Sequence, residues 1–235
     1  MFKKFLMALA LVMAPHAASA QAVWVDYGLM MNAGSQATAE TAVKGYLGNN
    51  SKFEGLAIFN QTMINGANPQ THNLAIIYKD QASWESSSAA LSGSSAQNAF
   101  LRTMMANGKL LHETAYMHVK GWGKVAEEGT QYIAFAMQVK NPSRYIQFLD
   151  EYSREPGNAT EIASIDVFQV LAGGVPGVTH IAVIATPKRS EFMTRYTSPQ
   201  FSQYLRKFAN VRSVLGTSYS DNLSFNGSLA LSSLR

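Results

Sequence analysis

The feature that most constrains this chain is an internal repeat: segments of the first half recur in the second at offsets of 104 to 109 residues. AVWVDYGLMMN (22–32) aligns with QYIAFAMQVKN (131–141) at 109, and Thr71-His72 aligns with Thr179-His180 at 108. Farther on, the tripeptide FLR (100–102) aligns with YLR (204–206) at an offset of 104. Matches that keep their order and nearly constant spacing predict two copies of one structural unit.

Each copy has the same predicted order of elements. A strand over Val23–Met31 is followed by a helix from Ser35 to Leu47 and by two strands around a turn rich in Asn, Gly and Pro. A broken helix over 81–107 and a last strand complete the copy. The remaining strands of the first copy are expected over 55–64, 71–79 and 113–120, and those of the second over 132–140, 162–171, 178–186 and 213–219.

The order β-α-β-β-α-β is that of a ferredoxin-like unit. The predicted fold class is therefore α+β, with two tandem ferredoxin-like units over residues 21–124 and 125–235 whose sheets pack face to face within one chain. Such a unit has an apolar sheet face that a second sheet must cover.

Two such units in one chain resemble the dimeric α/β-barrel superfamily. Ser198-Pro199-Gln200-Phe201, before the apolar stripe of the last helix, is similar to the antibiotic-biosynthesis-monooxygenase type of unit. The superfamily includes cofactor-free monooxygenases, haem enzymes, isomerases and proteins without known activity. The resemblance therefore implies an architecture and not one reaction.

Residues 1–20 have the features of a secretory signal peptide. Met1–Lys4 is basic, Phe5–Ala14 is an apolar run of ten residues, and Ala18-Ser19-Ala20 supplies the small residues before a cleavage site. Ten apolar residues are too few to cross a hydrocarbon core, which needs about 20. We therefore expect cleavage before Gln21, a periplasmic or secreted protein, and no membrane partner after cleavage.

The composition excludes several classes of function. The chain has no Cys, which excludes disulfides, thiolate metal sites and cysteine nucleophiles. Of its 19 Lys and Arg residues, two fall in the predicted signal peptide, and the remaining 17 form no dense run. Nucleic acid is therefore not an expected partner. The chain also lacks a P-loop, a dinucleotide fingerprint, HExxH and a nucleophile elbow.

We expect neither a metal nor a cofactor. Haem is the case to consider, because chlorite-dismutase-like proteins share the tandem architecture, and that resemblance implies an axial histidine on a helix of the second unit. The only histidine there, His180, falls on a predicted strand.

The first candidate site residues lie on the predicted hairpins. If each hairpin closes symmetrically about its turn, Gln61 lies opposite His72 and Gln169 lies opposite His180. A Gln that faces a His across antiparallel strands can fix the imidazole tautomer, which favours a polar ligand contact at the rim of each sheet. The alternative is a structural pair retained from an ancestral unit, and a one-residue slip in register would remove the pairing.

The second group of candidates belongs to the first copy alone. His118 shares a predicted strand face with Tyr116, and Asp26 shares one with Trp24 in an otherwise apolar row where the second copy, at the offset of 109, has Phe135. A carboxyl group in such a row must find a partner or have a raised pKa. We expect a ligand near these four residues, because apolar side chains would close the matching pocket of the second copy. The alternative is that Asp26 and His118 are ordinary partly exposed groups.

Two functional classes remain. Sparse titratable residues favour an exported protein that binds a small, largely apolar ligand without catalysis. The alternative, which the resemblance implies, is a cofactor-independent monooxygenase or isomerase that acts on an apolar substrate. A pocket of several hundred Å³ lined by Asp26 or His118 would favour the enzyme. A homo-oligomer is compatible with either class.

Overall fold

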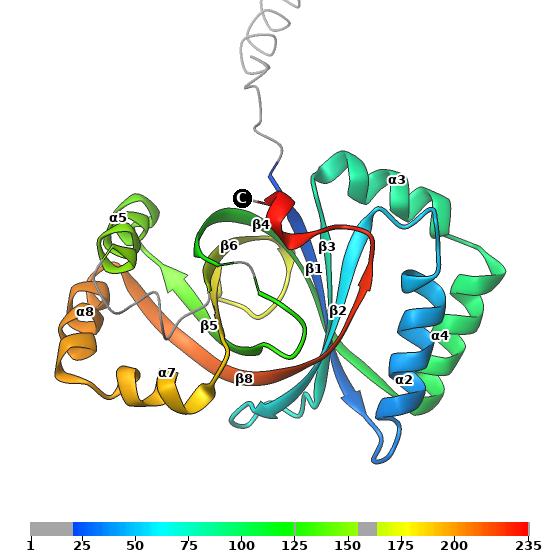
Figure 1. Ribbon diagram of the computed structural model, residues 1–235, viewed down its shortest axis with the longest axis horizontal. Helices are drawn as coiled ribbons and strands as arrows, with labels where there is room; N and C mark the ends of the chain where they lie inside the picture. Colours follow the sequence, from blue (N-terminus) through cyan, green and yellow to red (C-terminus); the bar gives the residue numbers. More distant parts are fainter. Residues whose placement is uncertain (1–20, 125, 155–163, 235) are drawn as a thin grey trace, which may run out of the picture.

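Eight antiparallel strands close into a barrel in the order β1-β3-β2-β8-β5-β7-β6-β4, with helices on two opposite sides (Figure 1). The computed structural model describes residues 21–124, 126–154 and 164–234, so the predicted signal peptide lies outside the described residues. The strands are β1 (Val23–Met31), β2 (Gly55–Ile64), β3 (His72–Tyr78), β4 (Gly108–Gly123), β5 (Gln131–Val139), β6 (Ser164–Gly173), β7 (His180–Thr186) and β8 (Arg212–Gly227).

Six α-helices are present in the described part of the chain. They are α2 (Gln36–Val43), which continues as a π-helical turn over Lys44–Gly48, α3 (Gln81–Leu91), α4 (Ser95–Asn107), α5 (Pro142–Ser153), α7 (Arg189–Tyr196) and α8 (Pro199–Ala209). Most begin where the sequence supplies a side-chain cap: Asp80, Ser94, Asn141 and Ser198 each accept a hydrogen bond from the backbone N–H three residues later. None of the described helices has the length and hydropathy needed to span a membrane.

The closure of the barrel joins the two halves along both edges. Strands β4-β1-β3-β2 form one ferredoxin-like sheet and β8-β5-β7-β6 form the other, and the pairs β2–β8 and β4–β6 connect them. The α+β class and the ferredoxin-like order are as predicted. The two sheets are also joined by hydrogen bonds along their edges, which makes them one closed barrel. Strands β4 and β8, at 16 residues each, are longer than predicted. Pairing with the opposite half explains residues 121–123 of β4 and 222–227 of β8, whereas residues 108–112 of β4 pair with β1 of the same half.

The register corrects one part of the sequence alignment. Leu29 pairs with His72, and Met137 pairs with His180, so the offset between β1 and β5 is 108 and not 109. Because side chains alternate across a strand, this one-residue difference moves every β5 side chain to the other face. The counterpart of Asp26 is therefore Ala134, and Phe135 faces the helices.

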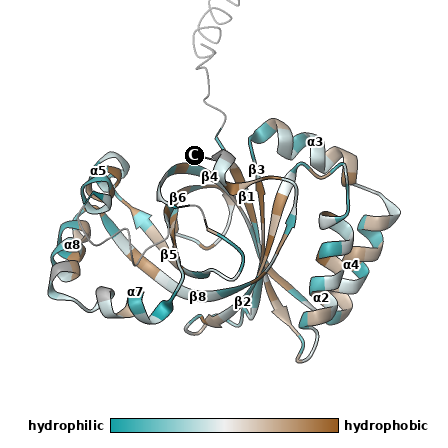
Figure 2. Cartoon of the chain, viewed as in Figure 1, coloured by the Kyte–Doolittle hydropathy of each residue, from teal (hydrophilic) through white to brown (hydrophobic). Residues whose placement is uncertain are grey.

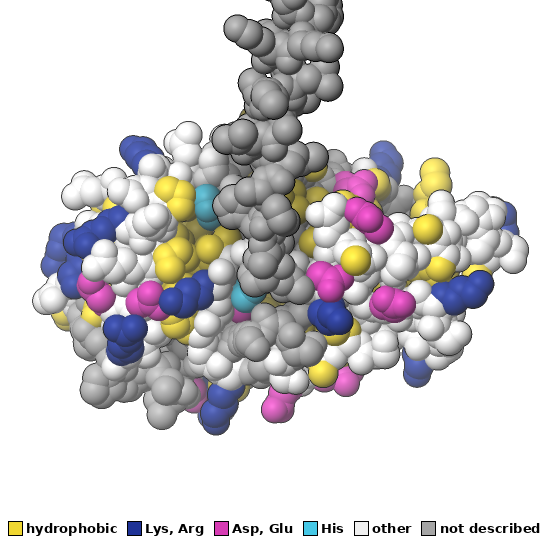
Figure 3. All heavy atoms as spheres, turned by 90° about the horizontal axis from the view of Figure 1, so that it is seen from above, with side chains coloured by type: hydrophobic (Ala, Val, Ile, Leu, Met, Phe, Trp, Pro, Cys, Tyr) yellow, Lys and Arg dark blue, Asp and Glu magenta, His cyan; other side chains and the backbone are white. Residues whose placement is uncertain are grey.

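Helices cover the outer surface of each half and form two separate cores. Helices α2, α3 and α4 pack on β1–β3 through a cluster that includes Phe59 and Leu47. Helices α5, α7 and α8 pack on β5–β7, where the predicted stripe Phe201, Tyr204 and Phe208 is buried. Figure 2 shows the hydrophobic residues concentrated along strands such as β1 and β3. Figure 3 shows the molecule from above the view of Figure 1. Hydrophobic side chains gather over the barrel, and Lys and Arg side chains are scattered over the surface.

Candidate functional site

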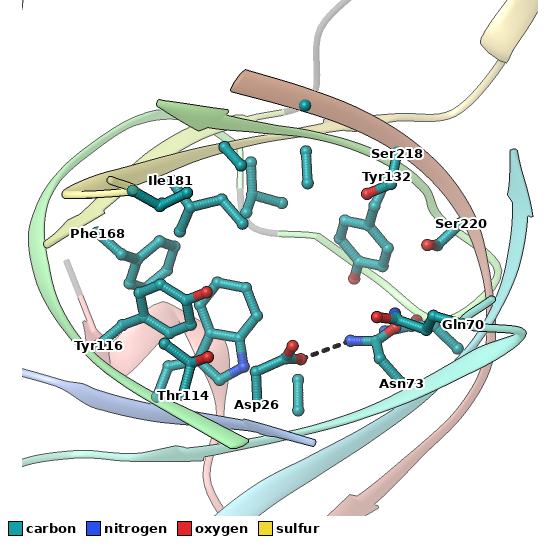
Figure 4. Close-up of a pocket in the computed structure, with 18 of the residues that line it drawn as sticks. Asp26, Gln70, Asn73, Thr114, Tyr116, Tyr132, Phe168, Ile181, Ser218 and Ser220 are labelled. Carbon is teal, nitrogen blue, oxygen red and sulfur yellow. Dashed lines mark hydrogen bonds between the residues drawn. The ribbon is translucent and has the colours of Figure 1, made fainter. Parts of the chain in front are cut away.

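The barrel encloses a cavity of about 510 Å³, and side chains from all eight strands line it. All four first-copy candidates, Trp24, Asp26, Tyr116 and His118, are part of its wall. The feature predicted to favour an enzyme, a pocket of several hundred Å³ lined by Asp26 or His118, is present. Figure 4 shows the interior, with Asp26 on one side and Tyr132 on the other.

The cavity opens at one end of the barrel. Its exposed lining residues are confined to the β2–β3 turn, the β6–β7 turn and the start of β8, where they include Ala67, Val175 and Leu215. At the other end the lining residues are buried, as Ile77 and Ser164 are, or half-buried, as Ala126 and Leu231 are. A ligand would therefore enter between the two turns and meet a largely apolar interior.

Three aromatic rings form a continuous apolar wall inside the cavity. The Trp24 and Tyr116 rings stack with their centroids 4.8 Å apart, and the Phe168 ring meets Trp24 edge-on at 4.8 Å. A wall of this kind favours a flat ligand that can stack on it.

Asp26 is the buried carboxyl group of this wall, with 7% of its surface exposed. It accepts a hydrogen bond of 2.8 Å from Asn73 Nδ2 (Figure 4). Burial raises the pKa of Asp26 to about 6, and the Asn73 bond and the charge of nearby His112 limit the rise. Near neutral pH this group can therefore accept a proton from a bound molecule.

His112 lies between Asp26 and the opening of the cavity. Its Nε2 lies 2.8 Å from Oε1 of Gln70 on the β2–β3 turn. The imidazole also packs directly over Gly28, where any β-carbon would collide with the ring. Glycine at this position therefore allows the histidine to approach the β1 backbone.

A second polar cluster lies on a different part of the wall. His118 Nε2 is 3.1 Å from Asp166 Oδ1, a contact between β4 and β6, and the His118 ring lies 5.1 Å from that of Phe168. Asp166 and Ile58 are counterparts at the 108 offset, and both line the cavity. The cavity thus has carboxyl groups contributed by both halves.

The hairpin candidates have the predicted register but lie outside the cavity. Gln61 pairs with His72 and Gln169 pairs with His180. The His72 ring stacks on Phe59, which belongs to the core beneath the helices. Burial lowers the pKa of both histidines. The two pairs therefore lie on the helix-covered side of the barrel, away from the pocket.

The hydrogen-bond partner of Nδ1 in each of these histidines is a threonine and not the predicted glutamine. His72 Nδ1 lies 3.0 Å from Thr71 Oγ1, which also accepts a hydrogen bond from the N–H of Met31 at 2.8 Å. His180 Nδ1 lies 2.9 Å from Thr179 Oγ1 in the same way. Each histidine thus has a partner within the fold, which is the arrangement that the structural alternative describes.

Second-half residues that line the cavity are absent from the residues predicted from the sequence. At the corrected offset, Tyr132 replaces Trp24 and Ala134 replaces Asp26, and both line the pocket. The expectation that Phe135 closes a second pocket was wrong, because both halves share one cavity. Consistent use of the offset set by Thr71-His72 and Thr179-His180 would have predicted this arrangement.

Comparisons with known proteins identify the fold. No family model and no curated protein matches the chain. Among solved structures, a "putative monooxygenase" from Fusobacterium nucleatum has a TM-score of 0.65 at 11% identity, over 89% of this chain and 95% of that one. An anthrone oxidase-like protein has a TM-score of 0.60 at 12% identity, over 89% and 94%. The chain thus has the fold of the dimeric α/β-barrel superfamily, in agreement with the predicted resemblance.

Chlorite dismutases share this fold, and a variant from Candidatus Nitrospira defluvii has a TM-score of 0.55 at 9% identity, over 88% of this chain and 94% of that one. The residues present here do not fit haem. His180, the only histidine of the second half, is buried on β7 and bonded to Thr179. The Nε2 atoms of the cavity histidines His112 and His118 already face Gln70 and Asp166. The described residues also contain no group of three or more metal-ligating side chains.

Proposed function

We propose that this protein is a cofactor-independent oxygenase that removes a proton from an acidic C–H group of a flat, apolar substrate. Asp26 is the general base. The observation that carries the proposal is a buried carboxyl group with a pKa of about 6 on the wall of an apolar cavity. The names of several proteins with this fold, among them an anthrone oxidase-like protein, support the same class of reaction.

The proposed reaction needs only oxygen as co-substrate. The Asp26 carboxylate takes a proton from a CH₂ group that is activated by neighbouring aromatic rings or a carbonyl. The resulting carbanion gives its electrons to O₂ and forms a carbon–oxygen bond, and protonation then yields a hydroperoxide. Loss of water from the hydroperoxide leaves a ketone, so that R₂CH₂ and O₂ give R₂C=O and H₂O.

Each part of the cavity has a role in this scheme. The rings of Trp24, Tyr116 and Phe168 hold the flat substrate by stacking. Asn73 donates to Asp26 and fixes the direction of its carboxyl group. The apolar wall excludes water, which keeps the pKa of the base raised and protects the carbanion from solvent.

The test uses anthrone as the probe in air-saturated buffer. The wild-type protein should produce anthraquinone faster than the buffer blank and consume one O₂ per product. Asp26→Asn should lower kcat by about 100-fold or more, the usual contribution of a general base. The control is Asp150→Asn, which removes a carboxylate that pairs with Lys120 outside the cavity. Equal rates for wild type and Asp26→Asn would refute the proposal.

Binding without catalysis is the second candidate. The alkyl side chains Ile58, Ala75, Ile77 and Val183 make up much of the remaining wall and offer only apolar contact. In this case anthrone would bind and remain unoxidised, and Asp26→Asn would leave its affinity unchanged or increase it.

Three further expectations belong to the proposal. The basic and apolar segments of residues 1–20 support export and cleavage before Gln21, which N-terminal sequencing of the mature protein tests. The shared offsets of 104 and 108 support an origin of the two halves by duplication. The fold is also compatible with a homo-oligomer, which light scattering of the purified protein tests.

A further inference from the structure

Four buried polar side-chain atoms on the cavity wall have no hydrogen-bond partner among the residues that the structure describes. Asn65 Nδ2 and His112 Nδ1 lie toward the open end of the cavity. Deeper in the cavity are Nε1 of Trp24 and the hydroxyl group of Tyr132. Both residues line the cavity. A buried polar group without a partner is costly, and most such groups in folded proteins are satisfied. This pair therefore requires an explanation.

The two donors occupy counterpart positions in the two halves. Trp24 pairs with Ile77 of β3, and Tyr132 pairs with Ala185 of β7, which gives the offset of 108 in both strands. In the eight-stranded ring, β1 and β5 are separated by three strands on either side, so they face each other across the barrel. The donors therefore come from opposite walls at the same level of one cavity.

Both groups act as donors at neutral pH. An indole N–H can only donate. Burial raises the pKa of Tyr132, and the negative charge of Asp166 adds to the rise, so the phenol keeps its proton. The hydroxyl group is directed into the cavity (Figure 4). The deeper part of the cavity therefore lacks a pair of acceptors, one for each of these two donors.

We propose that the ligand of this cavity is flat and carries oxygen acceptors on two opposite edges, one for Trp24 and one for Tyr132. Quinones, diketones and ring systems with a ketone opposite a second oxygen have this pattern. The inference rests on the proposed function only in using the same cavity and a flat ligand, and it requires no turnover. Trp24 and Tyr132 would select the ligand and set its position relative to Asp26.

The test compares two probes with the same three-ring frame. Anthraquinone has carbonyl oxygens on opposite edges of its central ring, and anthracene has none. Equilibrium dialysis of the wild-type protein should give tighter binding of anthraquinone. Tyr132→Phe and Trp24→Phe should each reduce the ratio of the two affinities about threefold to tenfold, the usual value of one hydrogen bond. The ratio cancels any general loss of packing, because both probes experience it.

A matched control is Tyr145→Phe, which removes a buried hydroxyl group on the helix side, where it contacts Met137 Sδ. This variant should keep the wild-type ratio. A wild-type protein without preference for anthraquinone, or a preference that survives both substitutions, would overturn the inference.

A second measurement needs no variant. Hydrogen bonds from Trp24 and Tyr132 should lower the carbonyl stretching frequency of anthraquinone bound to the wild-type protein relative to the free compound in an apolar solvent, and an unshifted band would contradict the inference. The two proposals can fail separately. A preference for anthraquinone in Asp26→Asn without oxidation of anthrone by the wild type would support the donors and refute the base.

Discussion

The two halves of the barrel have the same strand order and register but contribute different chemistry to the shared cavity. On β1 and β3 the first half has Asp26 bonded to Asn73, and the counterparts on β5 and β7 are Ala134 and Ile181. On β2 and β6 the difference is reversed, because the first half has Ile58 where the second half has Asp166. Each half thus supplies one carboxyl group, at a different place.

The helix-covered side shows the opposite behaviour. There both halves keep Thr-His, and the threonine hydroxyl accepts from a backbone N–H at 2.8 Å in one half and 2.9 Å in the other. The comparison teaches that groups which hold the strands together are shared, whereas groups that face the cavity differ. Differences between the halves are therefore a guide to the site, and similarities are a guide to the scaffold.

The largest effect is expected from separating the halves. Residues 21–124 alone would leave β2 and β4 without the partners that they have in β8 and β6. Open strand edges and an exposed apolar sheet face favour association. Light scattering of this fragment should therefore detect dimers or aggregates. A folded, stable monomer would show that the halves do not depend on each other.

Moving the carboxyl group across the cavity should not preserve activity. In the variant Asp26→Ala/Ala134→Asp the new carboxyl group faces Ile181 and Val183 and lacks the donor that Asn73 provides. We expect anthrone oxidation to stay at least about 100-fold below that of the wild type, since a general base must be positioned as well as present. Wild-type rates in this variant would mean that the two walls are interchangeable.

The pH dependence of the reaction should report the same group. Only the carboxylate form of Asp26 can accept a proton, so kcat/KM for anthrone should rise with pH through about 6 and level off above 7. A profile measured from pH 4.5 to 8 checks this. A rate that is flat across pH 6 would assign the proton transfer to another group.

The raised pKa of Asp26 also has a consequence for stability. Between the unfolded value of 3.8 and the folded value of about 6, the folded state binds more protons, so stability falls as pH rises through this window. Asp26→Asn should therefore be more stable than the wild type at pH 8, by up to roughly 3 kcal/mol, and the gain should vanish below about pH 4. Urea unfolding at the two pH values measures the difference.

Asp150→Asn should change the pH dependence in the opposite direction. The hydrogen bond from Lys120 lowers the pKa of Asp150, so this group contributes stability that is present at neutral pH and is lost on acidification. The variant should therefore be less stable than the wild type at pH 8, with a smaller difference in acid. A gain for both variants at pH 8 would argue against the burial effect at Asp26.

The smallest effect concerns the shared scaffold. Thr71→Val and Thr179→Val each remove the hydroxyl group that accepts a backbone N–H, and each should cost about 1–2 kcal/mol in the free energy of unfolding. The two losses should be equal within error and leave anthraquinone binding unchanged. Unequal losses, or a change in binding from either variant, would break the distinction between scaffold and site.

Much of the fold could be predicted because local patterns decide it. The bounds of β1 and β2 match the expected ranges, and the hairpin register follows from the turn alone. The full length of β4 and β8 could not be predicted in this way. The last residues of both strands pair with the opposite half, and this pairing depends on contacts far apart in the chain.

The site was predictable only in part. The alternation along β1 placed Trp24 and Asp26 on one face, and that face does line the cavity. The hairpin histidines were left with two interpretations, a ligand contact or a structural pair, because register alone does not tell which side of a sheet the helices cover. Tyr132 was missed because the 109 offset assigned its strand to the wrong face.

The covalent link between the halves has a stereochemical consequence. If two identical chains formed this barrel, each wall residue would face its own image, and two copies of Asp26 would share one apolar cavity and raise each other's pKa. A ligand could then bind equally well in two orientations. In this chain Asp26 has Ala134 as its image, and Trp24 has Tyr132. A prochiral substrate would therefore present a single face to the base, and the proton removed should be the same one in every turnover.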